Sequence, residues 1–164
     1  MGTRSRIGVM HGDKVKSVYC HWDGYLEHNG RILLEHYDSA KANFLVALGD
    51  ISSLGRQIGE AHPFSKFELE NTDPEYAIKL ALLEQAEAQG WTTFYGRDRG
   101  ETGTEWKVAH TFEEFLEQAD NCGAEYYYIM RDGEWYVGTT YSSGSLAKRL
   151  VLLTEALATE TETQ

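Results

Sequence analysis

Hydrophobic residues are concentrated in residues 5–10 (SRIGVM) and 14–20 (KVKSVYC), on either side of the polar tripeptide His11-Gly12-Asp13. Two such segments around a Gly-Asp pair, which favours a tight turn, are typical of paired strands. The pattern therefore predicts a β-hairpin at the start of the chain.

Two further hairpins are predicted by the same pattern. One has AEYYYIM (124–130) and EWYVGTTY (134–141) as strands around the turn Arg131-Asp132-Gly133, and the other has WTTFYG (91–96) and TEWKVAH (104–110) around the polar loop RDRGETG (97–103). The aromatic residues of the hairpin formed by 124–130 and 134–141 are interpreted as core residues and cross-strand pairs. They are Tyr126, Tyr127, Tyr128, Trp135 and Tyr136.

Helical periodicity and capping signals separate these strands. Asn29, Asp38, Asp73 and Thr111 are placed as residues that begin helices, and Gly49 and Gly90 as residues that end them. The predicted helices cover residues 30–37, 39–49, 74–89, 112–120 and 145–157, and residues 59–72 form a connector.

Three hairpins with helices between them predict an α+β fold, in which helices cover an antiparallel sheet of about six strands. A chain of 164 residues is long enough for one hydrophobic core. We expect residues 1–158 to form a single domain and residues 159–164 to be a flexible acidic tail.

Composition and charge narrow the classes of partner. No apolar run approaches the length of a membrane span, and the N-terminal MGTRSRIG lacks the apolar core of a signal peptide, so a cytoplasmic protein without membrane contact is expected. The two cysteines, Cys20 and Cys122, have no CxxC spacing and are expected to be free thiols.

The net charge of −11 is unevenly distributed along the chain. Residues 1–60 carry seven basic and seven acidic side chains, whereas residues 61–164 carry eight basic and nineteen acidic ones. The sequence contains no basic stripe of the kind that would indicate direct nucleic-acid binding. The acidity is typical of a solvated surface, and it could also mimic nucleic acid toward a basic partner.

The densest polar chemistry lies in YCHWDGYLEHNG, residues 19–30. His21 and Asp23 would share one face of a strand and could act together as an acid–base pair. Alternatively, Asp23 forms a turn before Gly24 and His21 fills a half-buried site. The histidines and Cys20 match no metal-binding motif, so neither a metal nor another cofactor is predicted.

A second polar cluster is Tyr95-Gly-Arg97-Asp-Arg99-Gly-Glu101. Arginines flanked by glycines suit the recognition of phosphate or carboxylate. The alternative is a loop in which Asp98 and Glu101 neutralise the two arginines.

Both clusters could contribute to one pocket, because Arg4 and Arg6, at the start of the first strand, should lie next to His21 if the first hairpin pairs in this way. Arginines beside aromatic side chains have the composition of a site for a nucleotide-like ligand, in which rings stack on a base and guanidinium groups bind phosphate. The predicted ligand-binding residues are Arg4, His21, Trp22, Asp23, Tyr25, Tyr95, Arg97, Arg99 and Glu101.

The strings TRSRIGV, VKSVYCHWDGYLEHNGRILLEHY, ALGDISSLG and FYGRDRGE resemble a family of small accessory proteins encoded by tailed bacteriophages and prophages. The resemblance is dense over the first 60 residues and sparser over 91–101. It implies a protein that acts in the host-cell cytoplasm, against host defence or on host machinery.

Three functions fit this context. The first is sequestration of a nucleotide-derived immune signal, the second is inhibition of a host defence protein by the acidic C-terminal two thirds, and the third is cleavage of such a nucleotide by His21 and Asp23. We favour sequestration, and a non-enzymatic protein, because the arginine and aromatic residues suit binding. A homo-oligomer is possible, since a partner subunit can supply pocket walls.

Overall fold

The computed structural model describes residues 2–162 and contains one mixed sheet of eight strands. Seven strands follow the order β4-β3-β2-β1-β6-β7-β8, and β5 pairs with β2 beside β3. Their bounds are β1 Ser5–His11, β2 Lys14–Cys20, β3 Ile51–Ser53, β4 Thr93–Phe94, β5 Lys107–Ala109, β6 Tyr126–Arg131, β7 Glu134–Thr139 and β8 Val151–Leu152.

The predicted α+β class is confirmed, and so are the first and last hairpins, because β1 pairs with β2 and β6 with β7 in antiparallel registers. Sequence periodicity did not indicate that β1 also pairs with β6, in parallel. The sheet is therefore mostly antiparallel, with parallel pairs at β1–β6 and β2–β3.

The predicted hairpin of residues 91–96 and 104–110 is wrong. β4 pairs with β3 and β5 pairs with β2, so the two segments join different strands. The predicted polar loop between them is also wrong in part, because Tyr95–Arg99 form a short helix, α4, that ends at left-handed Gly100. Pairing with distant strands outweighed the local turn signal.

Helices lie on both sides of the sheet. On one side, which we call the α2 face, the π-helical turn η1 (Leu26–Gly30) runs into α1 (Arg31–His36), followed by α2 (Ser39–Ala47) and, near the C-terminus, α6 (Leu153–Glu162). The other side, the α5 face, is covered by α5 (Phe112–Asn121). Ile7, Leu45 and Leu153 belong to the larger core on the α2 face, and Phe115 and Tyr127 to the smaller core on the α5 face.

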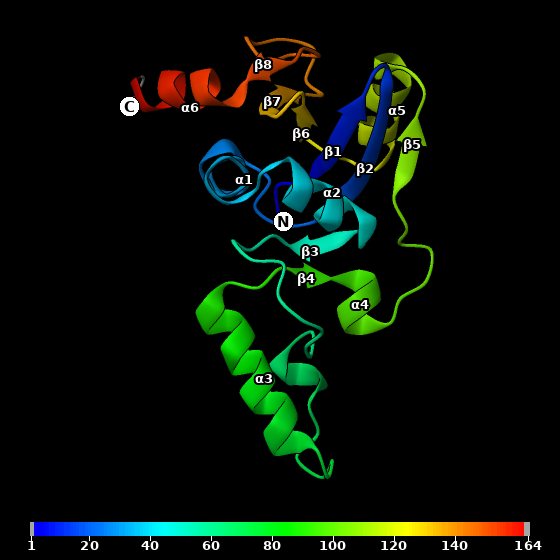
Figure 1. Cartoon of the computed structure of the whole chain (residues 1–164), viewed down its shortest axis with the longest axis vertical. Helices are drawn as coiled ribbons and strands as arrows, with labels where there is room; N and C mark the ends of the chain where they lie inside the picture. The colour runs from blue at the N-terminus through cyan, green and yellow to red at the C-terminus, as the bar shows by residue number, and fades with distance from the viewer. Residues whose placement is uncertain (1, 163–164) are drawn as a thin grey trace.

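One lobe projects away from the sheet, at the bottom of Figure 1. It contains the long helix α3 (Tyr76–Gln89) and the short 3-10 turn η2 (Lys66–Glu68). The helix starts two residues later than predicted, and Asp73 accepts a hydrogen bond from the backbone N–H of Glu75. As predicted, Gly90 ends the helix in a left-handed conformation.

Two other helix predictions need correction. Residues 145–150 are not helical, and after strand β8 the last helix runs from Leu153 through Glu162. The helix thus continues past residue 158, into the segment predicted to be a tail, of which residues 163 and 164 lie outside the described part. Asn29 does not cap a helix, because its buried amide donates to Ser5, Cys20 and the carbonyl of Trp22.

A glycine in β7 allows the segment before β8 to lie close to the sheet. A Cβ atom added at Gly138 would overlap the carbonyl oxygen of Arg149 and the hydroxyl of Tyr127. These two groups form a hydrogen bond of 2.7 Å. Glycine at position 138 therefore allows the segment that contains Arg149 to lie close to β7.

We predict that Gly138→Ala lowers the free energy of unfolding by about 1–3 kcal/mol, because an overpacked site must shift its backbone. Urea-induced unfolding measures this change. Ser143→Ala, an exposed change in the neighbouring loop, is the control and should alter stability by less than about 0.5 kcal/mol. An equally small effect of Gly138→Ala would contradict the close approach.

Candidate functional site: an arginine and aromatic surface beside α5

The register of the first hairpin brings four polar side chains to one face of the sheet. Arg6 lies opposite Tyr19, and one step beyond the Ser5–Cys20 pair the register places Arg4 opposite His21. Residues two apart on a strand point to the same side. Arg4, Arg6, Tyr19 and His21 therefore share the α5 face.

Tyr19 and His21 form a close hydrogen-bonded pair. The Tyr19 hydroxyl lies 2.6 Å from Nδ1 of His21. Burial, and secondly the charge of Arg4, lower the pKa of His21, so the imidazole is neutral at pH 7. We assign the tyrosine as donor to Nδ1, which leaves the proton on Nε2. His21 can then donate a hydrogen bond to a ligand.

Tyr19 stays protonated in this pair. Burial raises the pKa of Tyr19 to about 12, and the positive charge of Arg4 offsets part of that increase. Its backbone N–H donates to the carboxylate of Asp50 at 2.9 Å. The hydroxyl is thus a fixed donor at neutral pH rather than a base.

Arg6 carries a buried charge without a carboxylate in direct contact, although the charge of Asp50 interacts with it at longer range. Arg6 as a whole is only 2% exposed to solvent. The guanidinium donates to the Ser17 hydroxyl at 2.7 Å, to the Ser17 carbonyl at 3.2 Å and to Sγ of Cys122 at 3.8 Å. Among residues 2–162, no carboxylate lies within ion-pair distance of it.

Arg4 is exposed and has no side-chain hydrogen bond or ion pair within the described chain. Its backbone is fixed, because its carbonyl accepts the N–H of Glu125 at 2.8 Å. Its guanidinium lies against Gly123, just after α5, where a Cβ atom would come within 2.9 Å of Nη1. The charge is therefore held at the surface and is available for an external anion.

Trp22 extends this group with an aromatic ring. The ring is 43% exposed and packs edge-on against His21, with 4.6 Å between the centroids. The backbone N–H of Trp22 donates to Ser52 on β3, which holds the residue beside the sheet. We call Arg4, Arg6, Tyr19, His21 and Trp22 together the Arg4–His21 surface.

Tyr95 lies near this surface. Its ionisation influences that of Tyr19, and its own pKa is raised by burial while a hydrogen bond with Ser52 opposes that shift. Its ring packs at 5.8 Å from that of Phe64. Of the predicted ligand-binding residues, the structure thus brings His21 and Trp22 into contact and places Arg4 within electrostatic range of His21. Tyr95 is within electrostatic range of Tyr19.

Asp23 and Tyr25 belong to a different group. Asp23 adopts a left-handed conformation, with φ of 57°, and its carboxylate lies 4.0 Å from Nε2 of His28. The ring of Tyr25 also faces His28, at 6.0 Å. The partner of His21 is Tyr19 and not Asp23, which favours the turn interpretation of Asp23 over the acid–base pair.

The guanidinium of Arg97 is engaged in hydrogen bonds within the protein and is not free to bind a ligand. Its guanidinium donates to the carboxylate of Asp98 and to the carbonyl oxygens of Gly59 and Thr92. The carboxylate of Asp98 is fully buried and also accepts the backbone N–H groups of Phe94 and His62. This network joins α4 to the start of the projecting lobe.

Arg99 and Glu101 lie on the outside of α4. Arg99 is half-exposed and lies 3.7 Å from a carboxylate oxygen of Glu68 and 3.6 Å from one of Glu101. Its guanidinium also faces the ring of Phe64. The interpretation in which acidic neighbours neutralise both arginines of this segment fits these contacts.

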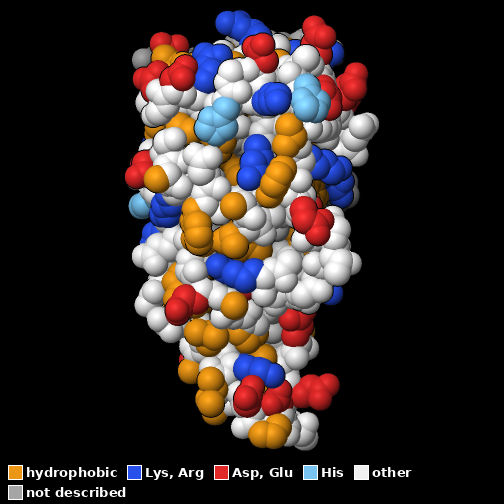
Figure 2. All heavy atoms as spheres, turned by 45° about the vertical axis from the view of Figure 1, so that its right-hand side comes forward, with side chains coloured by type: hydrophobic (Ala, Val, Ile, Leu, Met, Phe, Trp, Pro, Cys, Tyr) orange, Lys and Arg blue, Asp and Glu red, His pale blue; other side chains and the backbone are white. Residues whose placement is uncertain are grey.

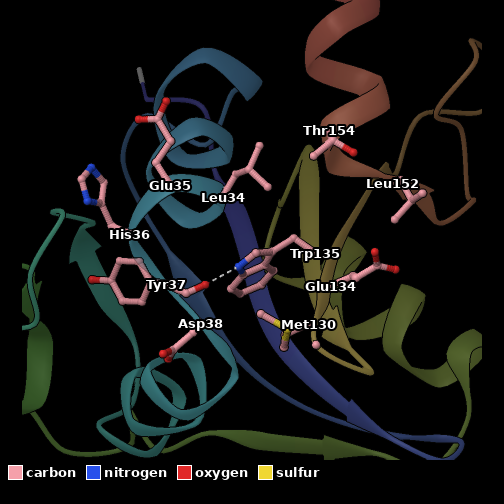
Figure 3. A pocket seen from close by; sticks show the side chains of 11 residues that line it. Leu34, Glu35, His36, Tyr37, Asp38, Met130, Glu134, Trp135, Leu152 and Thr154 are labelled. Atoms are coloured by element: carbon pink, nitrogen blue, oxygen red, sulfur yellow. Dashed lines mark hydrogen bonds between the residues drawn. The ribbon is translucent and has the colours of Figure 1, made fainter.

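A groove on the α2 face contains none of the predicted residues (Figure 3). It has a volume of about 490 Å³, and at its floor Trp135 donates a hydrogen bond to the carbonyl of Tyr37. Its charged lining consists of carboxylates, including Asp38 and Glu134, and no lysine or arginine is among its lining residues in the described chain. An anion would be repelled there.

The α5 face has a different character. Figure 2 brings the side with α5, β5 and α4 forward and shows lysine and arginine side chains interleaved with hydrophobic ones over its middle part. The acidic excess of the chain therefore does not cover this face uniformly.

Comparisons with known proteins add no assignment: no family model, curated protein or solved structure matches the chain. Within residues 2–162, no helix is long and apolar enough to cross a membrane. The same residues contain no group of three or more histidine, cysteine or acidic side chains that could hold a metal ion.

Sequence reasoning placed Arg6 beside Arg4 but missed Tyr19. Tyr19 follows from the register once the first hairpin is accepted, because it lies two residues from His21 and opposite Arg6. Cys122 and Gly123 gave no such signal, since α5 reaches β1 only through tertiary packing.

We predict that Arg97→Gln lowers the free energy of unfolding by about 3 kcal/mol, because it leaves the buried Asp98 carboxylate without its charged partner. The matched change Arg99→Gln, at a half-exposed ion pair, should cost less than about 0.5 kcal/mol. Chemical denaturation of the two variants makes the comparison. Equal effects would contradict the separate roles of the two arginines.

We also predict that NMR titration of His21 gives a pKa below the ordinary value of 6.5. Arg4→Gln should raise this pKa only partly, since burial is the larger cause. Because the folded-state pKa is depressed, the contribution of His21 to stability is present above the ordinary pKa and is lost as pH falls through the folded pKa. A wild-type pKa above 6.5, or one that Arg4→Gln leaves unchanged while Lys14→Gln shifts it, would contradict the geometry.

Proposed function

We propose that the Arg4–His21 surface binds a small anionic ligand that carries an aromatic ring, and that a nucleotide-derived signal is the natural example. The observation that carries this proposal is the pair of guanidinium groups on the α5 face, neither of which has a carboxylate within 4.0 Å among residues 2–162. Of the two, only Arg6 is buried. A buried charge is normally balanced by an opposite one, and the more distant Asp50 supplies part of that balance. A bound anion would complete this arrangement.

Each group on the surface has a role in such binding. Arg4 offers a planar, two-pronged donor set for a phosphate, and His21 Nε2 and the charge of Arg6 add to the attraction. Arg6 acts at longer range, because its buried guanidinium already donates to Ser17 and Cys122. The exposed ring of Trp22 provides a stacking platform for a base.

Binding without conversion of the ligand is the better supported activity. His21 has a tyrosine as its partner rather than a carboxylate. The neighbouring thiol, Cys20, is fully buried, and burial raises its pKa to about 12, so it is not a nucleophile at neutral pH. These features favour sequestration over cleavage.

The resemblance to phage accessory proteins supplies a setting for this activity. A protein that captures a nucleotide-derived immune signal in the cytoplasm of an infected host would lower its free concentration. The protein would recognise one phosphate of the ligand through Arg4 and one base through stacking on Trp22. Many cyclic and linear nucleotides have both features.

A second candidate function is inhibition of a host defence protein by the projecting lobe. Residues 60–90 contain seven acidic and two basic side chains. Within the lobe, Phe67 is fully exposed and Ile78 is 71% exposed. An acidic surface with apolar anchors suits contact with a basic protein. This candidate does not need the Arg4–His21 surface.

The test is to incubate the purified protein with a mixture of nucleotides, including cyclic dinucleotides and cyclic ADP-ribose isomers, and to release bound compounds by heat for mass spectrometry. We expect unaltered nucleotide from the wild type. Arg4→Gln and Trp22→Ala should each weaken binding of the released compound by about tenfold or more.

Phe44→Ala is the control, since Phe44 is a 58% exposed aromatic residue on α2. It should leave binding unchanged. Release of an altered nucleotide would support cleavage, and capture of no compound by the wild type would contradict the proposal.

A further inference from the structure

In addition to the groove on the α2 face, the α5 face has a cavity of its own, which lies at the opposite end of β1 from Arg4. It has a volume of about 340 Å³. Its walls come from the β1–β2 hairpin, the first residue of α5, the end of β6 and the segment 148–150 before β8. None of the residues of the Arg4–His21 surface lines it.

Three cations face this cavity and are opposed by one carboxylate. The cations are Arg131, Lys148 and Arg149, and the carboxylate is Asp13. No carboxylate of residues 2–162 lies within ion-pair distance of any of the three cations. The local charge is therefore positive in a chain whose net charge is −11.

The cations make few other contacts. The guanidinium of Arg131 lies over the ring of Tyr136, 4.2 Å from its centroid. Arg149 donates only to the carbonyl of Ser145, at 3.2 Å, among the described residues. Most of their N–H groups are thus free to bind an anion that enters the cavity.

The backbone that carries two of the cations is fixed. The N–H of Lys148 donates to the carbonyl of Thr139 at 2.8 Å, and the Tyr127 hydroxyl donates to the carbonyl of Arg149 at 2.7 Å. Lys148 has φ of 51°, in the left-handed region that favours glycine. Backbone strain at a non-glycine residue is typical of sites where function requires the side chain.

Part of the cavity lining is apolar. Phe112, Met10 and Leu150 are half-buried and pack on the smaller core. The ring of Phe112 is held by edge contacts, with its centroid 5.8 Å from that of Tyr127. Ligand sites combine apolar lining residues with polar groups that fix the orientation of the ligand, and this cavity offers both.

We infer that this cavity binds an amphipathic anion, in which a phosphate, sulfonate or carboxylate group is attached to an aromatic or alkyl body. The anionic group would lie between Arg131 and Lys148, and the apolar body would contact Phe112. A volume of about 340 Å³ is at the lower end of the range for ligand pockets, so the ligand is small. This site is independent of the proposed function of the Arg4–His21 surface.

The test uses three matched probes in titrations followed by NMR and calorimetry. Phenyl phosphate has both features, inorganic phosphate has only the charge, and benzyl alcohol has only the ring. We expect phenyl phosphate to bind at least about tenfold more tightly than either of the others, because both parts of the cavity contribute. The amide signals that shift should be those of residues 131 and 148–150.

Lys148→Gly and Arg131→Gln should each weaken phenyl phosphate binding by about tenfold. Lys148→Gly suits the left-handed backbone, so this variant should keep the fold, which its unchanged amide spectrum away from the cavity would verify. Lys14→Gln, an exposed cation of the same hairpin that does not line the cavity, is the control for general charge and should have no effect.

Arg4→Gln should also leave phenyl phosphate binding at this cavity unchanged, which separates this inference from the proposed function. Equal affinity for all three probes, or equal loss of binding in Lys148→Gly and Lys14→Gln, would overturn the inference.

Discussion

A buried guanidinium in the middle of the sheet constrains much of what surrounds it. Arg6 lies on β1, between β2 and β6, and its charge is met by the hydroxyl and carbonyl of Ser17 and by the thiol of Cys122. Leaving such a group unpaired costs several kcal/mol. Its contacts therefore tie together two strands and the end of α5. The same register brings Arg4, Tyr19 and His21 to one surface, where an external anion can complete the charge balance.

Local signals in the sequence predict the parts of the fold that form locally. The Gly-Asp and Asp-Gly turns identify the β1–β2 and β6–β7 hairpins, and Gly90 and Thr111 mark real helix ends. Pairings between distant segments leave no such signal. The parallel pair β1–β6 joins residues more than a hundred positions apart, and β4 and β5 bond to different strands despite a loop between them that resembles a hairpin turn.

The candidate site shows the same division. Arg4, His21 and Trp22 were predictable because they lie on one hairpin, whose register is fixed by its turn. The segment around Arg97 and Arg99 was ambiguous, since two glycines and two arginines are compatible with both a ligand loop and a self-neutralising one. The buried carboxylate of Asp98 decides the role of Arg97, and its contacts involve a distant segment, because it accepts the backbone N–H of His62 while Arg97 donates to the carbonyl of Gly59. The cavity beside Lys148 could not be predicted, because its walls come from four distant segments.

The two sites proposed on the α5 face differ in how a ligand would be held, one on an open aromatic surface and the other in a small cavity. The proposal for the Arg4–His21 surface is tested most directly by following the Nε–Hε signal of Arg4 by NMR while a captured nucleotide is added. We expect this signal to shift and sharpen together with the indole signal of Trp22, and the signals of Arg97 to stay in place. A nucleotide that binds without moving the Arg4 and Trp22 signals would contradict the proposed site.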